Sequence, residues 1–296
     1  MRNFDTLRAL IRGDIKEKEM MSKHTYYGIG GPADAYITPK DKEDLSKILR
    51  FANKNSIPAY FIGSGSNLLI SDDGINGLVL SPGKAFRHLQ FNKSNLYAES
   101  GVMLGRIVRE SIKRNLSGLE SLIGVPGTLG GALVMNAGAF GGEISIYLKN
   151  VKIMNMKGKI KSYSPNDLNF AYRFSSFKKN EFIISAEFTL KKEDPRLIHE
   201  KRDSANMGRK SNQPLKFRSA GSVFKNPKNF AAGYLIDKVG LKGTKIGDAE
   251  ISKHHANFFI NNGKASSSDI LNLIKLAREK VKKQFRNYWC KISKTI

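Results

Sequence analysis

Residues 124–142 read GVPGTLGGALVMNAGAFGG, and eight of these nineteen residues are glycine or proline. A glycine loses more conformational freedom on folding than any other residue, so this density inside a folded chain indicates a backbone that approaches a partner closely. Small residues at 130–132 and 137–139 suit an isoalloxazine ring or a diphosphate against the main chain, with Thr128 and Asn136 as donors. The alternative is a glycine turn packed between sheets. The glycines expected to bind are Gly130, Gly131 and Gly138.

A second glycine-rich loop, GSGSN at residues 63–67, follows an apolar run that reads as a short buried strand. It continues into Leu-Leu-Ile rather than a helix, so a Rossmann turn fits poorly. Its glycines permit positive φ, and successive N–H groups can then point into one concavity and bind a pyrophosphate. A tight hairpin turn is the alternative. The residues expected to bind are Gly63, Ser64, Gly65, Ser66 and Asn67. We expect the two glycine-rich stretches to build one flavin-binding site.

Apolar periodicity and turn residues predict further elements along the chain. Helices are expected over 1–20, 41–55, 104–112 and from about Ser268 onward, and strands over 57–62, within about 145–191 and at 257–261. A polar, basic segment at 191–214 is the best candidate for a domain boundary.

Composition limits the classes of function. A length of 296 residues predicts roughly two domains. The net charge of +24 favours anionic partners such as nucleotides, nucleic acids or acidic lipid. The lysines are spread along the chain, so no nucleic-acid-binding tract is evident, and no apolar run is long enough to span a membrane. A charged N-terminus and a single cysteine, Cys290, favour a cytoplasmic protein without disulfides.

Seven motifs occur in the order typical of one family. They are IGG from 29, GSGSNLLISDDGINGLVL from 63, GLESLIGVPGTLGGALVMNAGAFGGE from 118, AYRFSSF from 171, SAGSVFKNP from 219, AAGYLIDKVGLKG from 231 and HHANFFIN from 254. From about Thr25 to Phe285 the chain therefore resembles UDP-N-acetylenolpyruvoylglucosamine reductase, the flavin enzyme of peptidoglycan precursor synthesis.

The resemblance implies an α+β fold in two parts. A two-lobed FAD-binding domain of the vanillyl-alcohol-oxidase type is expected at 21–205, with lobes at about 21–85 and 86–205. A smaller α+β substrate-binding domain is expected at 206–285. Residues 1–20 would then be an N-terminal helical segment and residues 286–296 a divergent tail.

The resemblance also implies a reaction. NADPH reduces FAD, and a hydride then passes from the flavin to C3 of the enolpyruvyl ether, which leaves carbanion or enolate character at C2. Ser222 matches the family's proton donor to C2, and Arg173 matches the arginine that polarises the substrate carboxylate. Substrate contacts are expected from Tyr172, Arg209, Lys225 and Asn226. The expected partners of this cytoplasmic monomer are the UDP-sugar and NADPH, without nucleic acid or membrane.

The adjacent histidines His254 and His255 resemble a metal pair. Adjacent residues on a strand point to opposite faces, and no carboxylate cluster is near in the sequence. We expect these residues to be structural or substrate-lining, and we expect no metal site.

The match with the family fails at two places. The family's third catalytic residue is a glutamate in a C-terminal strand of LExE type, whereas residues 286–296 read RNYWCKISKTI and hold no acid. We expect a tail replaced by truncation, a reading-frame change or divergence, with flavin binding retained and turnover of the enolpyruvyl sugar weak or absent. His24 also stands where the family usually has asparagine.

Two other functions stay open from the sequence. One is another FAD-dependent oxidoreductase of the same fold with a different substrate. Only the substrate-domain motif SAGSVFKNP, at residues 219–227, is evidence against it. The other is a basic nucleic-acid-binding protein, which the net charge alone supports.

Overall fold

The structure is a computed structural model, and it describes residues 4–83 and 85–285. These residues form two compact units, each built from separate parts of the chain. Among the described residues, unit 1 comprises 4–19, 33–63, 76–83 and 85–207, and unit 2 comprises 20–32, 64–75 and 208–285.

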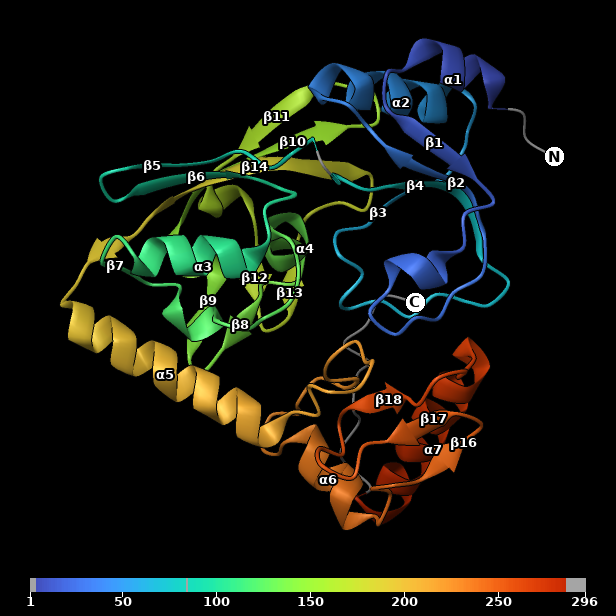
Figure 1. The fold of residues 1–296 in the computed structure, drawn as a ribbon, viewed down its shortest axis with the longest axis vertical. Coiled ribbons are helices and arrows are strands. Elements are labelled where there is room, and N and C mark those ends of the chain that lie inside the picture. The colour runs from blue at the N-terminus through green and yellow to red at the C-terminus, as the bar shows by residue number, and fades with distance from the viewer. Residues whose placement is uncertain (1–3, 84, 286–296) are drawn as a thin grey trace. The chain divides into compact units, whose positions relative to one another are not determined.

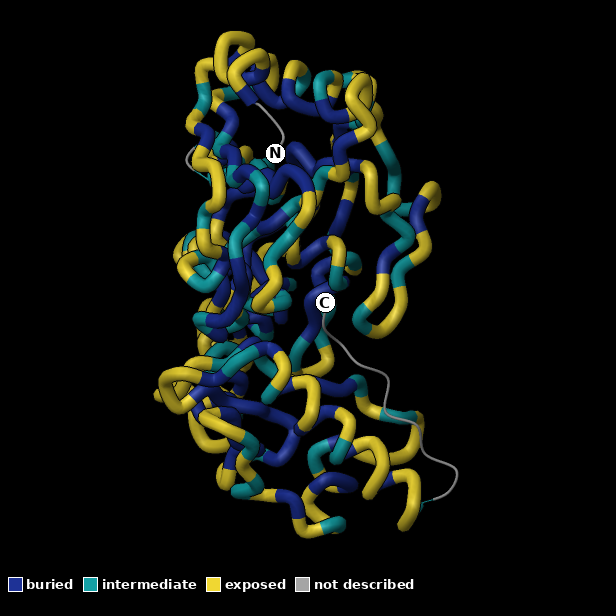
Figure 2. Tube along the Cα trace, turned by 90° about the vertical axis from the view of Figure 1, so that its right-hand side faces the viewer, coloured by how far each residue is buried: buried dark blue, intermediate teal, exposed yellow. Residues whose placement is uncertain are grey.

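Unit 1 contains a four-stranded sheet with the order β1-β2-β4-β3 (Figure 1). β1 pairs antiparallel with β2, and β3 pairs parallel with β4. β2 reads ADAYIT and buries every second residue, as a strand with one face on a core does. Figure 2 shows how buried and exposed positions change along the trace. The strands are β1 Asp14–Glu17, β2 Ala33–Thr38, β3 Ala59–Phe61 and β4 Ile75–Leu80.

A five-stranded antiparallel sheet with the order β11-β10-β14-β6-β5 is the centre of unit 1. Its central strand, β14, reads EFIISAEFT and is buried along nearly its whole length, because it carries apolar side chains on both faces and both faces are covered. The strands are β5 Leu89–Asn92, β6 Asn95–Glu99, β10 Leu148–Asn155, β11 Ile160–Tyr163 and β14 Glu181–Thr189.

Each face of this sheet has its own apolar core. Ile183 packs with α3 (Leu104–Ile112) and α4 (Leu129–Val134), which lie on one face in Figure 1. Phe182 and Ile184 point the other way and pack with α2 (Lys42–Lys54). The helix α2 buries Leu45, Ile48, Leu49 and Ala52, the helical spacing read from the sequence.

Short elements complete unit 1. Two-stranded pairs are formed by β7 Leu116–Ser117 with β15 Lys191–Lys192, by β8 Gly138–Ala139 with β9 Gly142–Glu143, and by β12 Phe170–Ala171 with β13 Phe174–Ser175. Helix α1 spans Asp5–Leu10, and α5 (Pro195–Asn212) begins in unit 1 and ends in unit 2, since the division falls between Met207 and Gly208. Short 3₁₀ turns occur at Met21–His24 in unit 2 and at Glu120–Leu122, Ile144–Tyr147 and Pro165–Asp167 in unit 1.

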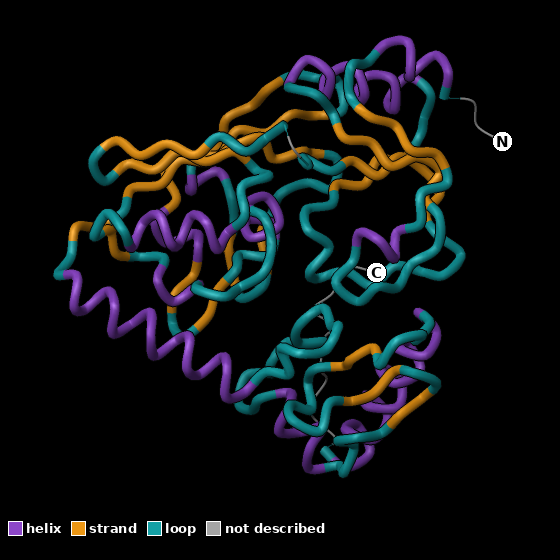
Figure 3. Tube along the Cα trace, viewed as in Figure 1, coloured by secondary structure: helices purple, strands orange, loops and turns teal. Residues whose placement is uncertain are grey.

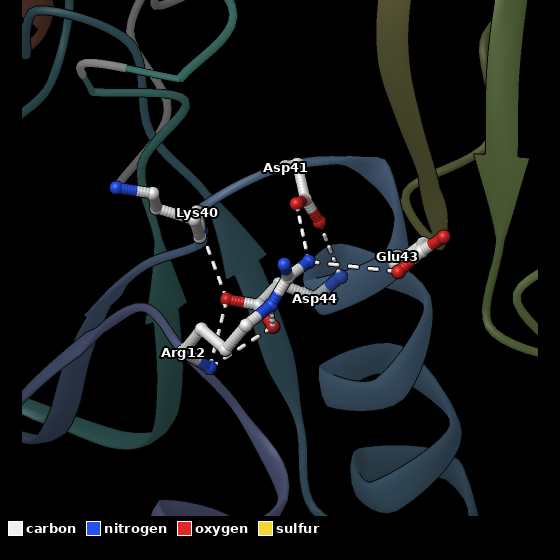
Figure 4. A network of polar contacts seen from close by, with 5 residues as sticks. All are labelled: Arg12, Lys40, Asp41, Glu43 and Asp44. Carbon is white, nitrogen blue, oxygen red and sulfur yellow. Dashed lines mark hydrogen bonds and ion pairs between the residues drawn. The ribbon is translucent and has the colours of Figure 1, made fainter.

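A buried carboxylate fixes the start of α2 (Figure 4). Asp44 is completely buried, and its oxygens accept the backbone N–H of Arg12 and of Lys40 at 3.0 Å. Asp41 caps the helix by accepting the N–H of Asp44 at 3.0 Å, and it also pairs with the guanidinium of Arg12. The network therefore ties the turn before β1 and the end of β2 to one helix N-terminus.

Unit 2 is a small α+β unit (Figure 3). Its antiparallel sheet has the order β16-β17-β18, and α7 contacts both β16 and β17 while α6 contacts α7. A capping box starts α7, in which Ser266 and Asp269 each accept the other's backbone N–H. The elements are α6 Ala232–Lys238, β16 Lys245–Ile246, β17 Ala249–Ile251, β18 Phe259–Asn261 and α7 Ser267–Gln284.

Two contacts join distant parts of the chain within unit 2. The Asp72 carboxylate accepts the N–H and the hydroxyl of Ser267 at 2.7 and 2.8 Å. The Asn261 amide donates to the carbonyl of Tyr27 at 2.8 Å. The loops at 20–32 and 64–75 are thus fastened to the C-terminal elements.

The structure corrects one expected element and leaves two expectations open. Residues 1–20 do not form a single helix, since α1 ends at Leu10 and Asp14–Glu17 is a strand. The predicted divergent tail at 286–296 lies outside the described residues. The predicted boundary at 205 lies close to the division at Met207 and Gly208, although the expected domains are continuous and the two compact units are not.

Candidate functional site

The glycine-rich stretch 124–142 runs alongside the turn after β6. The carbonyls of Gly127 and Ser100 accept the N–H of Leu104 and Gly130 at 2.9 and 3.0 Å. A Cβ at Gly130 would lie 3.2 Å from the Cβ of Ser100. The Cα of Gly63 also faces the Thr128 hydroxyl, so the last residue of unit 1 before loop 64–67 meets the start of α4.

Unsatisfied polar atoms occur in this stretch and in the turn after β6 beside it. The hydroxyls of Ser100 and Thr128 and the Oδ1 of Asn136 are buried and have no hydrogen-bond partner among the described residues. Buried polar atoms normally have such a partner, so these three atoms can bind a polar ligand that lies against the bare backbone. They fit FAD, whose ring edges and phosphates offer donors and acceptors. No pattern in the sequence singled out Ser100.

Asn136 lies at the centre of the second half of the stretch. It is completely buried and has a φ of 40°, in the left-handed region. Its Nδ2 donates to the Glu143 carboxylate at 2.8 Å and to the carbonyl of Ala171 at 3.1 Å. The side chain therefore holds β9 and β12 together, in addition to presenting Oδ1.

Arg173 occupies a two-residue turn between β12 and β13. Its Nη2 donates to the carbonyl of Gly138 at 2.6 Å, and its Cζ lies 5.0 Å from the centre of the exposed Tyr172 ring. The hydroxyl of Ser175 donates to the carbonyl of Val134 at 2.6 Å. The turn is thus fastened to the glycine-rich stretch at both ends.

Close approach requires a glycine at position 138. A Cβ there would lie 2.9 Å from the Glu143 Cγ and 3.2 Å from the Arg173 Nη1. Arg173 itself has a φ of 55°, a backbone conformation that costs energy for a residue other than glycine. Such strain occurs where neighbouring contacts hold a side chain in a functional position.

Loop 64–67 belongs to unit 2 and lies against the segment that contains IGG. The Gly65 carbonyl accepts the N–H of Tyr26 at 3.1 Å, and Gly65 has a φ of 67° with the carbonyl of His24 packed against its Cα. The hydroxyl of Ser64 is buried and has no partner in the described part of the chain. No helix follows the loop, which agrees with the sequence-based rejection of a Rossmann turn.

The SAGSVFKNP loop carries Ser222 in unit 2. The Ser222 side chain is exposed, and its backbone forms an antiparallel bridge with Phe258. Val223 and Phe224, which follow it, are buried. The side chain therefore stands at the surface on a backbone that a core holds in place.

Three of the four predicted substrate contacts, Arg209, Lys225 and Asn226, also lie in unit 2. Arg209 is buried on α5, and its Nη1 donates to the Gln213 amide at 3.5 Å. Asn226 accepts the N–H of Ala232 at 3.0 Å and so supports the start of α6, and the half-buried Lys225 precedes it. Arg173 and Tyr172 lie in unit 1, whereas Ser222 lies in unit 2.

The two histidines differ in environment. His254 is exposed, whereas His255 is half-buried, accepts the N–H of Asn257 on Nδ1 at 3.1 Å and packs edge-on against Phe258. Burial lowers the pKa of His255 below its ordinary value. Within residues 4–83 and 85–285, no three His, Cys, Asp or Glu side chains are placed to hold a metal ion together. None of the helices in that part of the chain has the length and apolar character to cross a membrane.

Comparison with known proteins agrees with this geometry. Residues 33–164 match the sequence profile of the FAD binding domain, and residues 213–287 match that of the UDP-N-acetylenolpyruvoylglucosamine reductase C-terminal domain. The chain is 40% identical over 273 residues to the UDP-N-acetylenolpyruvoylglucosamine reductase of Clostridium tetani, covering 92% of this chain and 89% of that protein. It is also 40% identical over 272 residues to the enzyme of that name from Listeria monocytogenes, covering 92% and 91%.

Solved structures give the same result. The crystal structure of the UDP-N-acetylenolpyruvylglucosamine reductase of Thermus caldophilus matches with a TM-score of 0.82 and 32% identity, over 96% of this chain and 98% of that one. A 4-ethylphenol oxidase from Gulosibacter chungangensis matches at a TM-score of 0.50 and 17% identity over 65% of this chain and 42% of that one, a likeness of fold alone. These matches, on a chain whose glycine-rich stretch presents unsatisfied polar atoms against bare backbone, show that the protein belongs to the UDP-N-acetylenolpyruvoylglucosamine reductase family.

Proposed function

We propose that this protein reduces UDP-N-acetylglucosamine enolpyruvate to UDP-N-acetylmuramate, with FAD as cofactor and NADPH as hydride donor. One observation carries the proposal: the similarity to reductases of this name extends over more than nine-tenths of the chain. The reductase-specific profile covers residues 213–287, which hold SAGSVFKNP, and this favours the reductase over another flavoprotein of the same fold.

The residues proposed to hold FAD come from both glycine-rich stretches. Buried acceptors and donors at Ser100, Thr128 and Asn136 would satisfy polar groups of the cofactor, and the bare backbone at Gly130, Gly131 and Gly138 admits its atoms closely. Loop 64–67, preceded by Gly63, would hold the pyrophosphate with its backbone N–H groups and serine hydroxyls. When bound, FAD supplies the hydride transfer that amino acid side chains cannot perform.

Arg173 is proposed to bind the carboxylate of the enolpyruvyl group. A guanidinium can form two parallel hydrogen bonds to a carboxylate, and it stays charged at any physiological pH. Because its Nη2 is already tied to Gly138, the cation is oriented before substrate arrives. Preoriented positive charge stabilises negative charge that develops next to the carboxylate during the reaction.

Ser222 is proposed to deliver the proton to C2 of the substrate. A serine hydroxyl is a weak acid, so it needs cations nearby that stabilise its alkoxide. Lys225 and Arg209 are proposed as contacts to the diphosphate-containing part of the substrate, together with Asn226 and Tyr172. The net charge of +24 supports this assignment because it attracts an anionic substrate.

An anaerobic spectral titration tests the proposal. Purified protein, reconstituted with FAD where necessary, is expected to lose its visible flavin absorbance on addition of NADPH. The absorbance should return when the UDP-enolpyruvyl sugar is added. A protein that binds no FAD, or a reduced flavin that this sugar does not reoxidise, would refute the proposal. We further propose a cytoplasmic monomer, which light scattering on the purified protein would test for oligomeric state.

A further inference from the structure

We propose that Asn257 is a positioning residue for Ser222: its side-chain amide fixes the two residues that follow the serine and so sets the place of the hydroxyl. The inference rests on the proposed function, since it assigns to Ser222 the delivery of a proton. All of the residues concerned lie in unit 2.

Asn257 pairs with the backbone of Phe224 in both directions. Its Oδ1 accepts the N–H of Phe224 at 2.8 Å, and its Nδ2 donates to the carbonyl of Phe224 at 2.9 Å. The Asn257 backbone carbonyl also accepts the N–H of Val223 at 2.8 Å. One residue thus makes three hydrogen bonds to the dipeptide directly after Ser222.

This arrangement is buried and therefore rigid. Asn257 is 2% exposed, and Val223 and Phe224 are 0% and 2% exposed. Water has little access to replace a lost bond, and a buried amide that loses a partner leaves both groups unsatisfied. Ser222 itself is exposed, and the buried backbone that Asn257 holds directly after it helps to place its hydroxyl.

The backbone around Asn257 is also fixed by contacts of its own. Its N–H donates to the Nδ1 of His255, and the next residue, Phe258, forms the backbone bridge with Ser222. The Asn257 amide therefore joins the chain segment around Phe258 to the segment that contains Ser222. The relative position of these two segments sets the position of the serine. Proton transfer requires the acid and the acceptor carbon to be aligned closely, and a misplacement of about 1 Å costs about 10²-fold in rate.

Comparing the two half-reactions distinguishes a positioning role of Asn257 from a general effect on protein stability. Reduction of the flavin by NADPH does not use Ser222, whereas reoxidation by the enolpyruvyl sugar does. In Asn257→Asp, one oxygen still accepts the N–H of Phe224, but the other faces the carbonyl of Phe224 and cannot donate while ionised. Protonation restores a donor at that position, and burial brings this protonation toward neutral pH.

The test is stopped-flow measurement of both half-reactions in the FAD-loaded full chain. Asn257→Asp should slow reoxidation by the sugar by about 10²-fold while flavin reduction by NADPH stays unchanged. The deficit relative to the wild type should shrink as pH is lowered. Equal slowing of both half-reactions, or unchanged reoxidation, or a deficit that does not shrink at lower pH, would overturn the inference.

Asn261→Asp is the matched control. Asn261 is 4% exposed, and its side-chain amide donates to Tyr27 and accepts the N–H groups of Gly263 and Ala265. Its backbone N–H donates to the carbonyl of Arg218, just before the Ser222 loop, but these side-chain bonds do not involve that loop. This variant should not slow reoxidation selectively. If Asn257→Asp loads no FAD, Asn257→Ser replaces it, with the same selective slowing expected but without the recovery at low pH. A wild type that the sugar fails to reoxidise would refute the proposed function, whereas a normal wild type with a normal Asn257→Asp variant refutes this inference alone.

Discussion

Arg173 shows how much a single residue's position depends on its neighbours. Its backbone is in the left-handed region, and its guanidinium is hydrogen-bonded to Gly138 while the adjoining strands are tied to Asn136 and Val134. The sequence singled out Arg173 only through the motif around it, because a lone arginine in a strand-rich segment is usually at the surface. The contact with Gly138 joins residues 35 apart in sequence, and no local pattern predicts it.

Gly138→Ala tests this placement. Its methyl group would meet the Glu143 side chain and the Arg173 guanidinium, so we expect a displaced cation and about a 10²-fold slower reoxidation of the flavin by substrate. Because Gly138 is also among the residues proposed to bind FAD, the rate is measured at saturating FAD, with FAD content read from the absorbance after gel filtration. Gly105→Ala on α3 is the control, because only the flexible end of Arg109 lies near its Cβ, and it should keep wild-type rates. Normal reoxidation in Gly138→Ala would contradict the role given to Arg173.

Thr128→Val tests the proposed cofactor site. The Thr128 hydroxyl is buried without a partner among the described residues, so its removal should not lower the thermal stability of the flavin-free protein. It should weaken FAD binding by about 1 kcal/mol, the value of one hydrogen bond, which is measurable by fluorescence titration. Thr189→Val, at an exposed hydroxyl bonded to Asn95, should leave the affinity unchanged. Loss of stability with unchanged affinity would show that the hydroxyl serves the protein rather than the cofactor.

At the scale of elements, apolar periodicity predicted correctly those helices and strands that pack a regular apolar face against a core. The helices α2, α3 and α7 each bury the periodic apolar residues that predicted them, and the strand β14 follows a continuous apolar run. Several elements were not predicted, and two of them show a physical reason. The strand β1 reads DIKE and buries only Ile15, so its pattern cannot be told from a charged helix turn. The helix α5 is polar and mostly exposed, and its segment was read only as a boundary.

The start of α2 depends on the Asp44 carboxylate. Asp44→Ala would leave the backbone N–H groups of Arg12 and Lys40 unsatisfied, and each such group costs about 1–3 kcal/mol. We expect a loss of about 3 kcal/mol in the free energy of unfolding, measured by urea denaturation. Glu43→Ala is the control, since that side chain is 82% exposed and should change stability by less than about 0.5 kcal/mol. A loss in Asp44→Ala no larger than the control's would contradict the account of Figure 4.

The connection between β17 and β18 should give the protein a pH dependence. Burial, with help from nearby His254 and Lys242, lowers the pKa of His255 in the folded state. The unfolded chain then binds more protons at acidic pH, so stability is lost as pH falls through about 6.5, the ordinary histidine value. Protonation also removes the acceptor for the Asn257 N–H.

His255→Asn should flatten this dependence, because asparagine keeps an acceptor and takes up no proton. The measurement is the melting temperature between mildly acidic and neutral pH. The exposed His88→Asn, in unit 1, should keep the wild-type slope. An unchanged slope in His255→Asn would show that other groups cause the acid sensitivity.

At the scale of the whole molecule, the order of segments along the chain does not show which segments pack into the same unit. The motifs pointed to a boundary near 205, but the segments 20–32 and 64–75 pack with the C-terminal elements through contacts such as Asp72 with Ser267. Such pairings are set by hydrogen bonds between residues nearly two hundred positions apart, which no window of sequence reveals. The family resemblance, in contrast, was readable because its glycine-rich motifs are unusual, and the comparisons confirm it.

The central claim is the identity of the substrate and the reaction, and the product of a single anaerobic turnover tests it most directly. Protein loaded with FAD is reduced with NADPH, mixed with UDP-N-acetylglucosamine enolpyruvate, and the sugar is recovered for mass spectrometry. Our account predicts a lactyl ether heavier than the enolpyruvyl sugar by two hydrogen atoms, formed only when NADPH is present. Recovery of the unchanged enolpyruvyl sugar from a fully reduced flavoprotein would contradict it.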